Sequence, residues 1–211
     1  MTETFDKACR RCSRLAGFLD RIADQHPDYY NKPVPPFGDV AARLLIVGLA
    51  PGMHGANRTG RPFTGDHAGI LLYRMLHEFG FSSGPASLAA DDGLQLKNCR
   101  ITNAVKCLPP DNKPVGSEIN SCNTFLANEL RRLPKDAVVL ALGGIAHRAV
   151  IRAVHLRQAD HKFAHAAVHE LGGDFALLDS YHCSRYNTNT GRLTEEMFRA
   201  VFAKASKLAG Q

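Results

Sequence analysis

Four short apolar runs alternate along the chain with longer segments whose apolar residues recur every three or four positions. Such runs predict strands buried on both faces, whereas the three-to-four spacing predicts helices with one apolar face. We expect strands at residues 43–49, 99–104, 137–142 and 175–178, and helices at residues 4–25, 68–79, 117–133, 144–153 and beyond 194. Strands that alternate with helices favour a parallel sheet covered on both sides. The pattern therefore predicts one α/β domain over residues 1–211, an α/β/α sandwich with a central four-stranded parallel sheet.

A long irregular segment, residues 48–66, directly follows the first predicted strand. It combines glycines with two prolines, two arginines and an isolated Phe63. In open α/β sheets, ligands bind in the crevice at the carboxyl ends of the strands. Glycines let the backbone approach a ligand, and an isolated aromatic ring offers a flat face for stacking. We therefore predict a functional loop here, with Asp66 capping the helix that follows.

The charge of the chain suggests what such a loop could bind. Twenty-six Lys and Arg against 20 Asp and Glu give a net charge of +6 and a pI near 9.1. That balance suits a polyanion such as nucleic acid, although many basic proteins bind none. The chain has no run of about 18 apolar residues, so no membrane span is expected. The first residues lack the basic and apolar regions of a signal peptide, so we expect a cytoplasmic protein.

A second polar segment, residues 180–192, follows the fourth predicted strand and should lie at the same sheet edge. It contains His182, small hydroxyl side chains, amides and an Arg-Tyr pair, which can contact phosphates and wedge against bases. Asn103 ends the second strand, and its amide can read the edge of a nucleobase. Each residue alone has an ordinary structural explanation. Because Phe63, Asn103 and His182 all follow strands, we expect them to share one crevice.

Four of the six cysteines are grouped in a way that favours a metal site. Cys9 and Cys12 form a C-x-x-C pair on the first predicted helix, Cys107 follows the second strand, and Cys122 lies in the next helix. In a reducing cytosol, cysteines so grouped more often hold metal than disulfides. The candidates are a [4Fe–4S] cluster and Zn²⁺, and the spacing does not choose between them. Cys99, in a strand, is expected to pack in the core.

Two long motifs resemble those of a known family. Residues 48–66 (GLAPGMHGANRTGRPFTGD) resemble motif one of the family 5 (type b) uracil-DNA glycosylases, and residues 182–194 (HCSRYNTNTGRLT) resemble their second motif. Residues 102–110 (TNAVKCLPP) are similar to a segment shared with the family 4 enzymes. The cysteines at 9, 12, 107 and 122 match the [4Fe–4S] ligand pattern of both families. The resemblance runs from Cys9 to about Thr194.

The resemblance implies a monofunctional DNA glycosylase of base excision repair. Such an enzyme flips uracil, and other deaminated bases such as hypoxanthine, out of double-stranded DNA and hydrolyses the glycosidic bond, leaving an abasic site. The cluster would be structural, since this hydrolysis requires no redox step. We expect a monomer by default.

The resemblance also suggests roles for individual residues. His182 would donate a hydrogen bond to a carbonyl oxygen of the leaving base, and Asn57 and Asn103 would position the attacking water. The expected base pocket comprises Gly48, Ala50, Pro51, Phe63 and Asn103. The expected DNA-binding residues are Arg58, Arg61, Ser184, Arg185, Tyr186 and Asn187.

Two positions depart from the family patterns. Cys183 stands where the second motif usually has a small apolar residue or Pro, which puts a thiol at the site margin. Leu49 replaces the Glu of family 4, so another polar group of the loop, or stabilisation of the leaving group, must carry the chemistry. Asp66 is the nearest carboxylate, but its position before a helix favours a structural cap.

Other functions remain open at this stage. One is a noncatalytic module that binds damaged DNA, and another is a redox protein that uses the cluster for electron transfer. A third is a family 4-like enzyme, against which Leu49 and the sequence of residues 54–58 argue.

Overall fold

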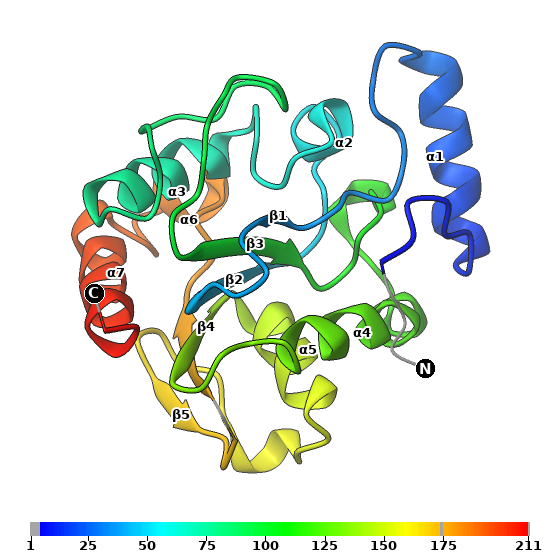
Figure 1. Cartoon of the computed structure of the whole chain (residues 1–211). Coiled ribbons are helices and arrows are strands. Elements are labelled where there is room, and N and C mark those ends of the chain that lie inside the picture. Colours follow the sequence, from blue (N-terminus) through cyan, green and yellow to red (C-terminus); the bar gives the residue numbers. More distant parts are fainter. Residues whose placement is uncertain (1–4, 174, 211) are drawn as a thin grey trace.

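A mixed sheet runs through the middle of the computed structural model, which describes residues 5–173 and 175–210 (Figure 1). Its strands within that part of the chain are β1 (Phe37–Gly38), β2 (Leu44–Gly48), β3 (Cys99–Asn103), β4 (Ala137–Leu142), β5 (Val168–Glu170) and β6 (Phe175–Ser180). The strand order is β1-β3-β2-β4-β6-β5. The central four strands are parallel, which confirms the predicted sheet. The edge strands β1 and β5 pair antiparallel and were not predicted, because two or three residues carry no readable pattern.

Helices cover both faces of the sheet, as expected. The α-helices of the described residues are α1 (Ser13–Gln25), α2 (Ala56–Thr59), α3 (His67–Glu78), α4 (Gly116–Leu130), α5 (Gly144–Ala153), α6 (Arg185–Asn189) and α7 (Glu195–Leu208), and the 3₁₀ turns are η1 (Pro110–Asn112) and η2 (Gln158–Asp160). None of these helices combines the length and apolar character needed to cross a membrane.

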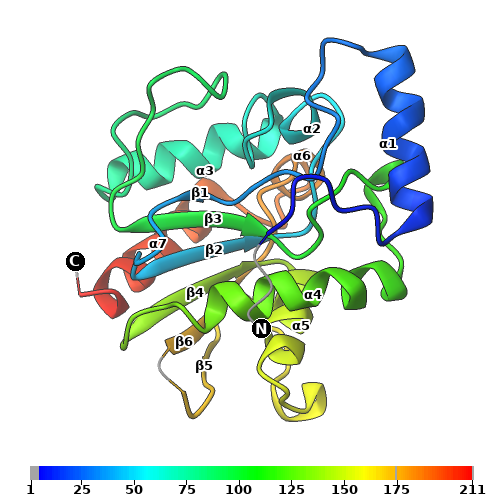
Figure 2. The ribbon, with the colours of Figure 1, turned by 45° about the vertical axis from the view of Figure 1, so that its right-hand side comes forward.

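The alternation of side chains along β2 divides the core into two layers. Leu44 and Ile46 pack on the face covered by α3 and α7, whereas Leu45 and Val47 pack on the face covered by α4 and α5. All four side chains are fully buried. Successive residues of a strand point to opposite faces, so an unbroken apolar run is what a strand between two helical layers requires. The layers are visible in Figure 2, where α3 and α4 lie on opposite sides of the sheet.

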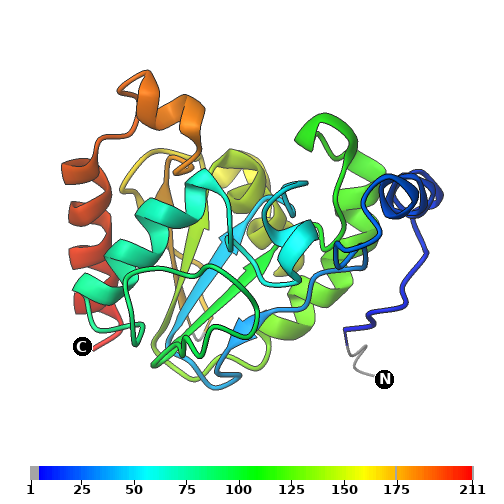
Figure 3. The ribbon, with the colours of Figure 1, turned by 90° about the horizontal axis from the view of Figure 1, so that it is seen from above.

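The first helix begins later than the sequence suggested. It starts at Ser13, and Cys12 occupies its N-cap position, so Cys9 and Cys12 lie before the helix rather than on it. The helix lies at the opposite end of the molecule from α7 (Figure 3). Its residues Leu19 and Ile22 pack against Leu108, beyond the end of β3. The apolar spacing located the helix but could not fix its first residue.

The carboxyl ends of the central strands meet at one edge of the sheet. Gly48 of β2 is in register with Asn103 of β3, and Leu142 of β4 is in register with Ser180 of β6. Helix α3 begins as predicted after Asp66, whose Oδ1 accepts a hydrogen bond of 2.9 Å from the backbone N–H of Gly69. The loops that leave this edge carry the candidate site.

Candidate active site

A cavity of about 490 Å³ opens at this edge, within the usual size range of small-ligand sites. Phe63, Asn103 and His182 all line it, together with Ala50 and Asp66. The three residues come from segments far apart in the sequence. The structure thus brings the predicted aromatic ring, amide and imidazole into one crevice.

Gly48 does not line the cavity itself but packs directly against two residues that do, Phe63 and Asn103. A Cβ atom at that position would lie 2.6 Å from Cζ of Phe63 and closer still to Oδ1 of Asn103. Any side chain would therefore displace both groups. Pro51, expected in the base pocket, is buried beside the loop but is not among the residues that line the cavity.

Phe63 is held by the loop that was predicted to be functional. Its φ is +53°, a left-handed conformation that is uncommon outside glycine. A side chain at Gly69 would overlap the carbonyl oxygen of Phe63, so the glycine lets the start of α3 close against this residue. The ring centroids of Phe63 and His182 are 5.9 Å apart and the planes are 28° from parallel. That separation is a direct ring contact, so a ligand meets the two rings side by side rather than between them.

His182 follows the end of β6 and is neutral at physiological pH. Burial lowers the pKa of its imidazole to about 4. A neutral imidazole carries one N–H donor and one acceptor. Its backbone oxygen accepts a hydrogen bond of 2.8 Å from Nδ2 of Asn187, which fixes the segment that carries the ring.

Asn103 presents an unsatisfied oxygen. Its side chain is 3% exposed, and Oδ1 is buried with no hydrogen-bond partner. A buried polar atom left unpaired costs about 1–3 kcal/mol, so such atoms usually have a partner. In a cavity wall, the missing partner is expected to come from a ligand that donates a hydrogen bond.

Asn57 does not share this position. It is fully buried in α2, does not line the cavity, and donates from Nδ2 to Oδ1 of Asn31 at 2.9 Å. This bond ties α2 to the loop after α1. Its Oδ1, like that of Asn103, is buried with no hydrogen-bond partner among the described residues. The role of Asn57 in positioning the attacking water therefore stays a prediction, although its donor is used within the protein.

Asp66 is more than a cap. While Oδ1 caps α3, the other carboxylate oxygen, Oδ2, faces Gly55, where a Cβ would lie 2.5 Å away. Asp66 lines the cavity, and burial raises the pKa of its carboxyl group. The sequence argument undervalued this residue, because an N-cap motif by itself gives no sign that the second oxygen faces a ligand site.

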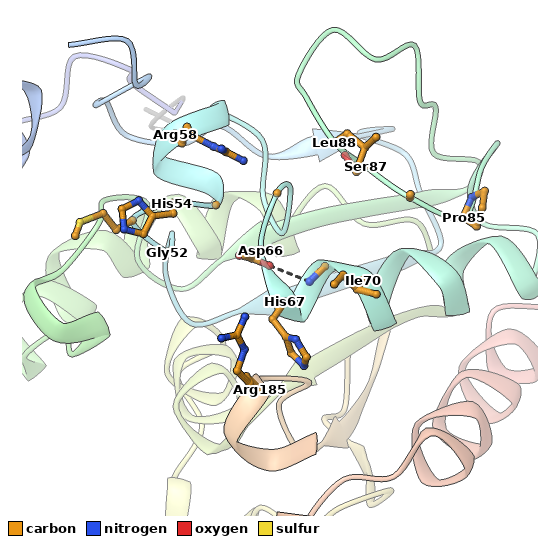
Figure 4. Close-up of a pocket in the computed structure, with 15 residues that line it drawn as sticks. Gly52, His54, Arg58, Asp66, His67, Ile70, Pro85, Ser87, Leu88 and Arg185 are labelled. Atoms are coloured by element: carbon orange, nitrogen blue, oxygen red, sulfur yellow. Dashed lines mark hydrogen bonds between the residues drawn. The ribbon is translucent and has the colours of Figure 1, made fainter. Parts of the chain in front are cut away.

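A larger groove of about 760 Å³ adjoins the cavity and shares Gly52, Asp66, His67 and Arg185 with it (Figure 4). Arg58 from α2 and Arg185 from α6 are exposed and line the groove, which suits a phosphate backbone. Tyr186 is exposed beside Arg185. Ser184 lines the neighbouring cavity, and its Oγ also caps α6 by accepting a 3.4 Å hydrogen bond from the backbone N–H of Asn187. The contacts of both residues with DNA stay predictions.

Arg61, the other arginine of the first motif, is not available to DNA. Its side chain is buried and forms an ion pair of 2.6 Å with Asp92. It also donates to Oγ of Ser87 at 2.9 Å and lies over the ring of Phe37. The prediction that Arg61 contacts DNA is wrong, because its guanidinium is used to hold the loop of residues 82–95.

The four cysteines predicted to bind metal surround one small cavity. Cys9 and Cys12 precede α1, Cys107 follows β3, and Cys122 belongs to α4. Burial, and then the proximity of the other three sulfurs, raises the pKa of Cys107 to about 12. Four thiolates this close would repel one another, so a positively charged centre is the species that this donor set fits.

The two other cysteines are fully buried. Cys99 packs in the core, as predicted. Cys183 does not present a thiol at the site margin, because its Sγ lies in the same core and donates to the carbonyl oxygen of Ala68 at 3.4 Å.

His147 of α5, Asp179 of β6 and His169 of β5 form a hydrogen-bonded network beside the strand end that leads to His182. Nδ1 of His147 is 2.8 Å from Oδ1 of Asp179, and its Nε2 is 2.8 Å from the carbonyl oxygen of His161. Both nitrogens face acceptors, so both carry protons and His147 is cationic. Burial alone would lower the pKa of His147, but the Asp179 carboxylate outweighs it, and the pKa is raised.

The charge of this network balances without any further ion. Nε2 of His169 donates to Oδ2 of Asp179 at 2.9 Å. The coordinating atoms of the three side chains lie within 4.8 Å of one another, as in a metal site. A divalent cation in place of the His147 proton would leave excess positive charge buried, which is costly. The ion pair of His147 and Asp179 therefore joins α5 to β6, near the two segments that carry Gly143 and His182.

Comparisons with known proteins agree with this geometry. The chain matches the family model of the uracil DNA glycosylase superfamily over residues 35–206. It is 49% identical to the type-5 uracil-DNA glycosylase of Thermus thermophilus, over 96% of this chain and 94% of that protein. It is 43% identical to the type-5 enzyme of Mycobacterium bovis over 96% and 78% of the two chains, and 28% identical to the type-4 enzyme of Archaeoglobus fulgidus over 97% and 89%. The chain belongs to the type-5 uracil-DNA glycosylases.

Proposed function

We propose that the protein is a monofunctional DNA glycosylase that flips uracil out of double-stranded DNA and hydrolyses its glycosidic bond. The observation that carries this proposal is the cavity in which Phe63, the unpaired Oδ1 of Asn103 and His182 meet. The names of the type-5 relatives state the same base and the same class of enzyme. The groove with Arg58 and Arg185 beside the cavity supports DNA as the substrate.

The residues suggest how the base is recognised. Uracil carries an N–H group between two carbonyl groups, and Oδ1 of Asn103 can accept from that N–H. Phe63 contributes a ring face, and base–aromatic stacking is worth about 1–3 kcal/mol. The duplex must release the base first, at a cost of a few kcal/mol that is smaller at a mismatched pair. Deaminated purines such as hypoxanthine are included in the proposal, because the cavity of about 490 Å³ does not restrict the site to pyrimidines by size.

The bond-breaking step places negative charge on the base. The glycosidic N–C1′ bond breaks, its electron pair leaves with the base, and an oxocarbenium-like sugar remains. The neutral His182 donates its N–H to a base carbonyl oxygen as that oxygen gains charge. One such donor is typically worth ~10²–10³ in rate. Desolvation of the half-buried ring maintains this neutral state.

Water then adds to C1′, and the proton that it loses neutralises the anionic base released in the previous step. Asp66 and Asn103 are the polar residues of the cavity wall that can position it. Asp66 has one carboxylate oxygen committed to capping α3, and the second is free to accept a hydrogen bond from the water. This assignment adds Asp66 to the candidates Asn57 and Asn103.

We further propose that Cys9, Cys12, Cys107 and Cys122 hold a [4Fe–4S] cluster. The support is their arrangement around one cavity. When bound, the cluster would supply a structural cross-link between the segment before α1 and the β3–α4 region, without taking part in hydrolysis. Iron and sulfide analysis should find the cluster in the purified protein. Cys122→Ala should lose it, whereas Cys99→Ala, in the core, should retain it.

The function is tested with duplexes that carry a single uracil or a single hypoxanthine. Base release should give alkali-labile abasic sites, faster with uracil opposite guanine than opposite adenine, because the mismatched base is easier to flip. A protein that binds these duplexes tightly but forms no abasic product would be a binding module instead. Gel filtration of the free protein is expected to show a monomer. A reduced cysteine site also accords with the cytoplasmic location predicted above.

A further inference from the structure

Exposed apolar side chains gather around the charged groove. Among the described residues, six large hydrophobic side chains are exposed, and two of them, Ile70 and Leu88, line the groove. A third, Tyr186, is the neighbour of Arg185 on the opposite side. A single exposed apolar residue needs no explanation, but a cluster around a cationic groove indicates a binding surface.

Leu88 is the most prominent of these residues. Its side chain is 73% exposed, at the tip of the loop of residues 82–95. Figure 4 shows it on one side of the groove, with Arg185 on the other side and Asp66 and His67 between them. Leu88 therefore projects towards the groove, and the loop that carries it is held by a set of hydrogen bonds.

Asp92 supports the tip from inside the loop. Its Oδ2 accepts the backbone N–H of Leu88 at 2.8 Å, and its Oδ1 accepts that of Leu94 at 3.0 Å. The buried Arg61 completes the bracket through its ion pair with Asp92 and a 2.5 Å hydrogen bond to the carbonyl oxygen of Ala90. Burial alone would raise the pKa of Asp92, but these hydrogen bonds hold it well below its usual range, so the bracket stays charged.

The tip is also fixed relative to the base cavity. Oγ of Ser87, the residue before Leu88, lies 2.8 Å from Oγ1 of Thr64. The backbone N–H of Gly65 donates to the carbonyl oxygen of Ser87 at 3.4 Å. Thr64 and Gly65 directly follow Phe63, so the exposed tip and the base-contacting ring are held by one continuous set of hydrogen bonds.

We propose that Leu88 is an apolar wedge that enters the base stack of duplex DNA beside the flipped nucleotide. This inference rests on the proposed glycosylase function and adds a residue from outside both family motifs to it. Proteins that open a base step commonly insert a side chain such as Leu, Ile or Phe. Because the bracket already orders the tip, insertion costs little conformational entropy. The cations of the groove hold the backbone on either side of the opened step.

The wedge is needed only where a stack must be opened. A uracil in single-stranded DNA can reach the cavity without the wedge, whereas a uracil in a duplex must first be unpaired and unstacked, which costs free energy. Loss of Leu88 should therefore change the ratio of duplex to single-strand activity. A residue that only stabilised the fold would lower both activities together.

The test compares Leu88→Ala with the wild-type holoprotein on both substrates. We expect kcat/KM on duplex DNA to fall ~10-fold, because a tenfold loss corresponds to part of the free energy needed to unstack one base step. The kcat/KM on single strands should change little. The fluorescence of 2-aminopurine placed next to the uracil should rise when wild type binds, and should rise less with Leu88→Ala. Leu88→Met should recover most of both signals.

The matched control is Val40→Ala. Val40 is 51% exposed and follows β1, near the start of β3 and therefore near the amino ends of the parallel strands. This variant should match wild type on both substrates. Equal losses on duplex and single-stranded DNA with Leu88→Ala, or no loss on either, would overturn the wedge. A wild-type protein that released no base at all would instead refute the proposed function, while the 2-aminopurine signal would still test Leu88, since it requires no bond cleavage.

Discussion

The floor of the base cavity and the rim of the groove are built in opposite ways. The floor consists of Gly48, Phe63, Asn103 and His182, which strand ends and close packing hold in place. The rim consists of Arg58, Leu88, Arg185 and Tyr186, which stand on loops and short helices and are exposed. The difference separates two tasks. The floor is expected to set the geometry of bond cleavage, whereas the rim is expected to hold and open the duplex.

The largest effect is expected from His182→Ala on the floor. The variant removes the donor that faces the charge developing on the base, so base release should slow by ~10²–10³-fold. Duplex affinity should remain close to wild type, because the groove is unchanged. Single-turnover release measured beside duplex binding checks both parts. The control is His155→Asn, at an exposed histidine, which should behave as wild type. If His182→Ala lost duplex binding to the same extent as base release, the separate roles of floor and rim would be contradicted.

Gly48→Ala should have the next largest effect. The added methyl group must move the ring of Phe63 and the amide of Asn103, and a displacement of about 1 Å can cost ~10²-fold in rate. Gly17→Ala is the matched control, since a Cβ there meets no heavy atom within 4 Å. We expect the control to keep full activity and to unfold at a slightly higher temperature, because Ala favours a helix interior over Gly. Unchanged kinetics of Gly48→Ala would show that the floor can adapt.

A smaller effect is expected at the rim. Arg185→Ala should weaken duplex binding several-fold and reduce the slope of log K against log salt by about 0.9, the contribution of one phosphate contact. Release from bound substrate should change little. Binding isotherms at several salt concentrations provide the measurement, with the exposed Arg157→Ala as control. A slope identical to wild type would mean that Arg185 does not contact a phosphate.

The smallest effect concerns pH. The pKa of His182 in the folded protein is about 4, below its ordinary value of 6.5. Between these two values the unfolded chain binds more protons at this residue than the folded protein does. The contribution of His182 to the free energy of unfolding is therefore full above about pH 6.5 and decreases as the pH falls towards 4. Thermal unfolding across pH 4–7 should be less pH-dependent in His182→Asn, and an identical pH dependence would contradict the neutral buried imidazole.

Some features of the site could be predicted because they depend on position along a strand. Phe63, Asn103 and His182 each follow a buried strand, and the ends of parallel strands must meet at one edge. The cap at Asp66 was placed correctly from the helix pattern that follows it, although its second role in the cavity wall was not. The four cysteines were grouped correctly as well, although the start of α1 was placed too early.

Other features depend on contacts between distant segments. Arg58 and Arg61 lie three residues apart in one motif, yet one is exposed at the groove and the other is buried against Asp92. Nothing in the motif marks this difference, because the partner of Arg61 lies 31 residues further along the chain. The amide donor of Asn57 is likewise used by Asn31, 26 residues earlier in the chain. The exposed tip at Leu88 had no signal at all, since an isolated Leu in a loop rich in small residues is unremarkable.

The sequence by itself determined the four central strands and the longer helices, the edge of the sheet at which the site lies, and the residue types that reach it. These follow from local patterns of apolar side chains and from the rule that parallel strands end together. Only the tertiary structure decided which polar side chains are consumed inside the protein and which are left for a ligand. Hydrogen-bond partners are assigned by distance in space, and a buried donor or acceptor takes whichever partner the fold brings within reach.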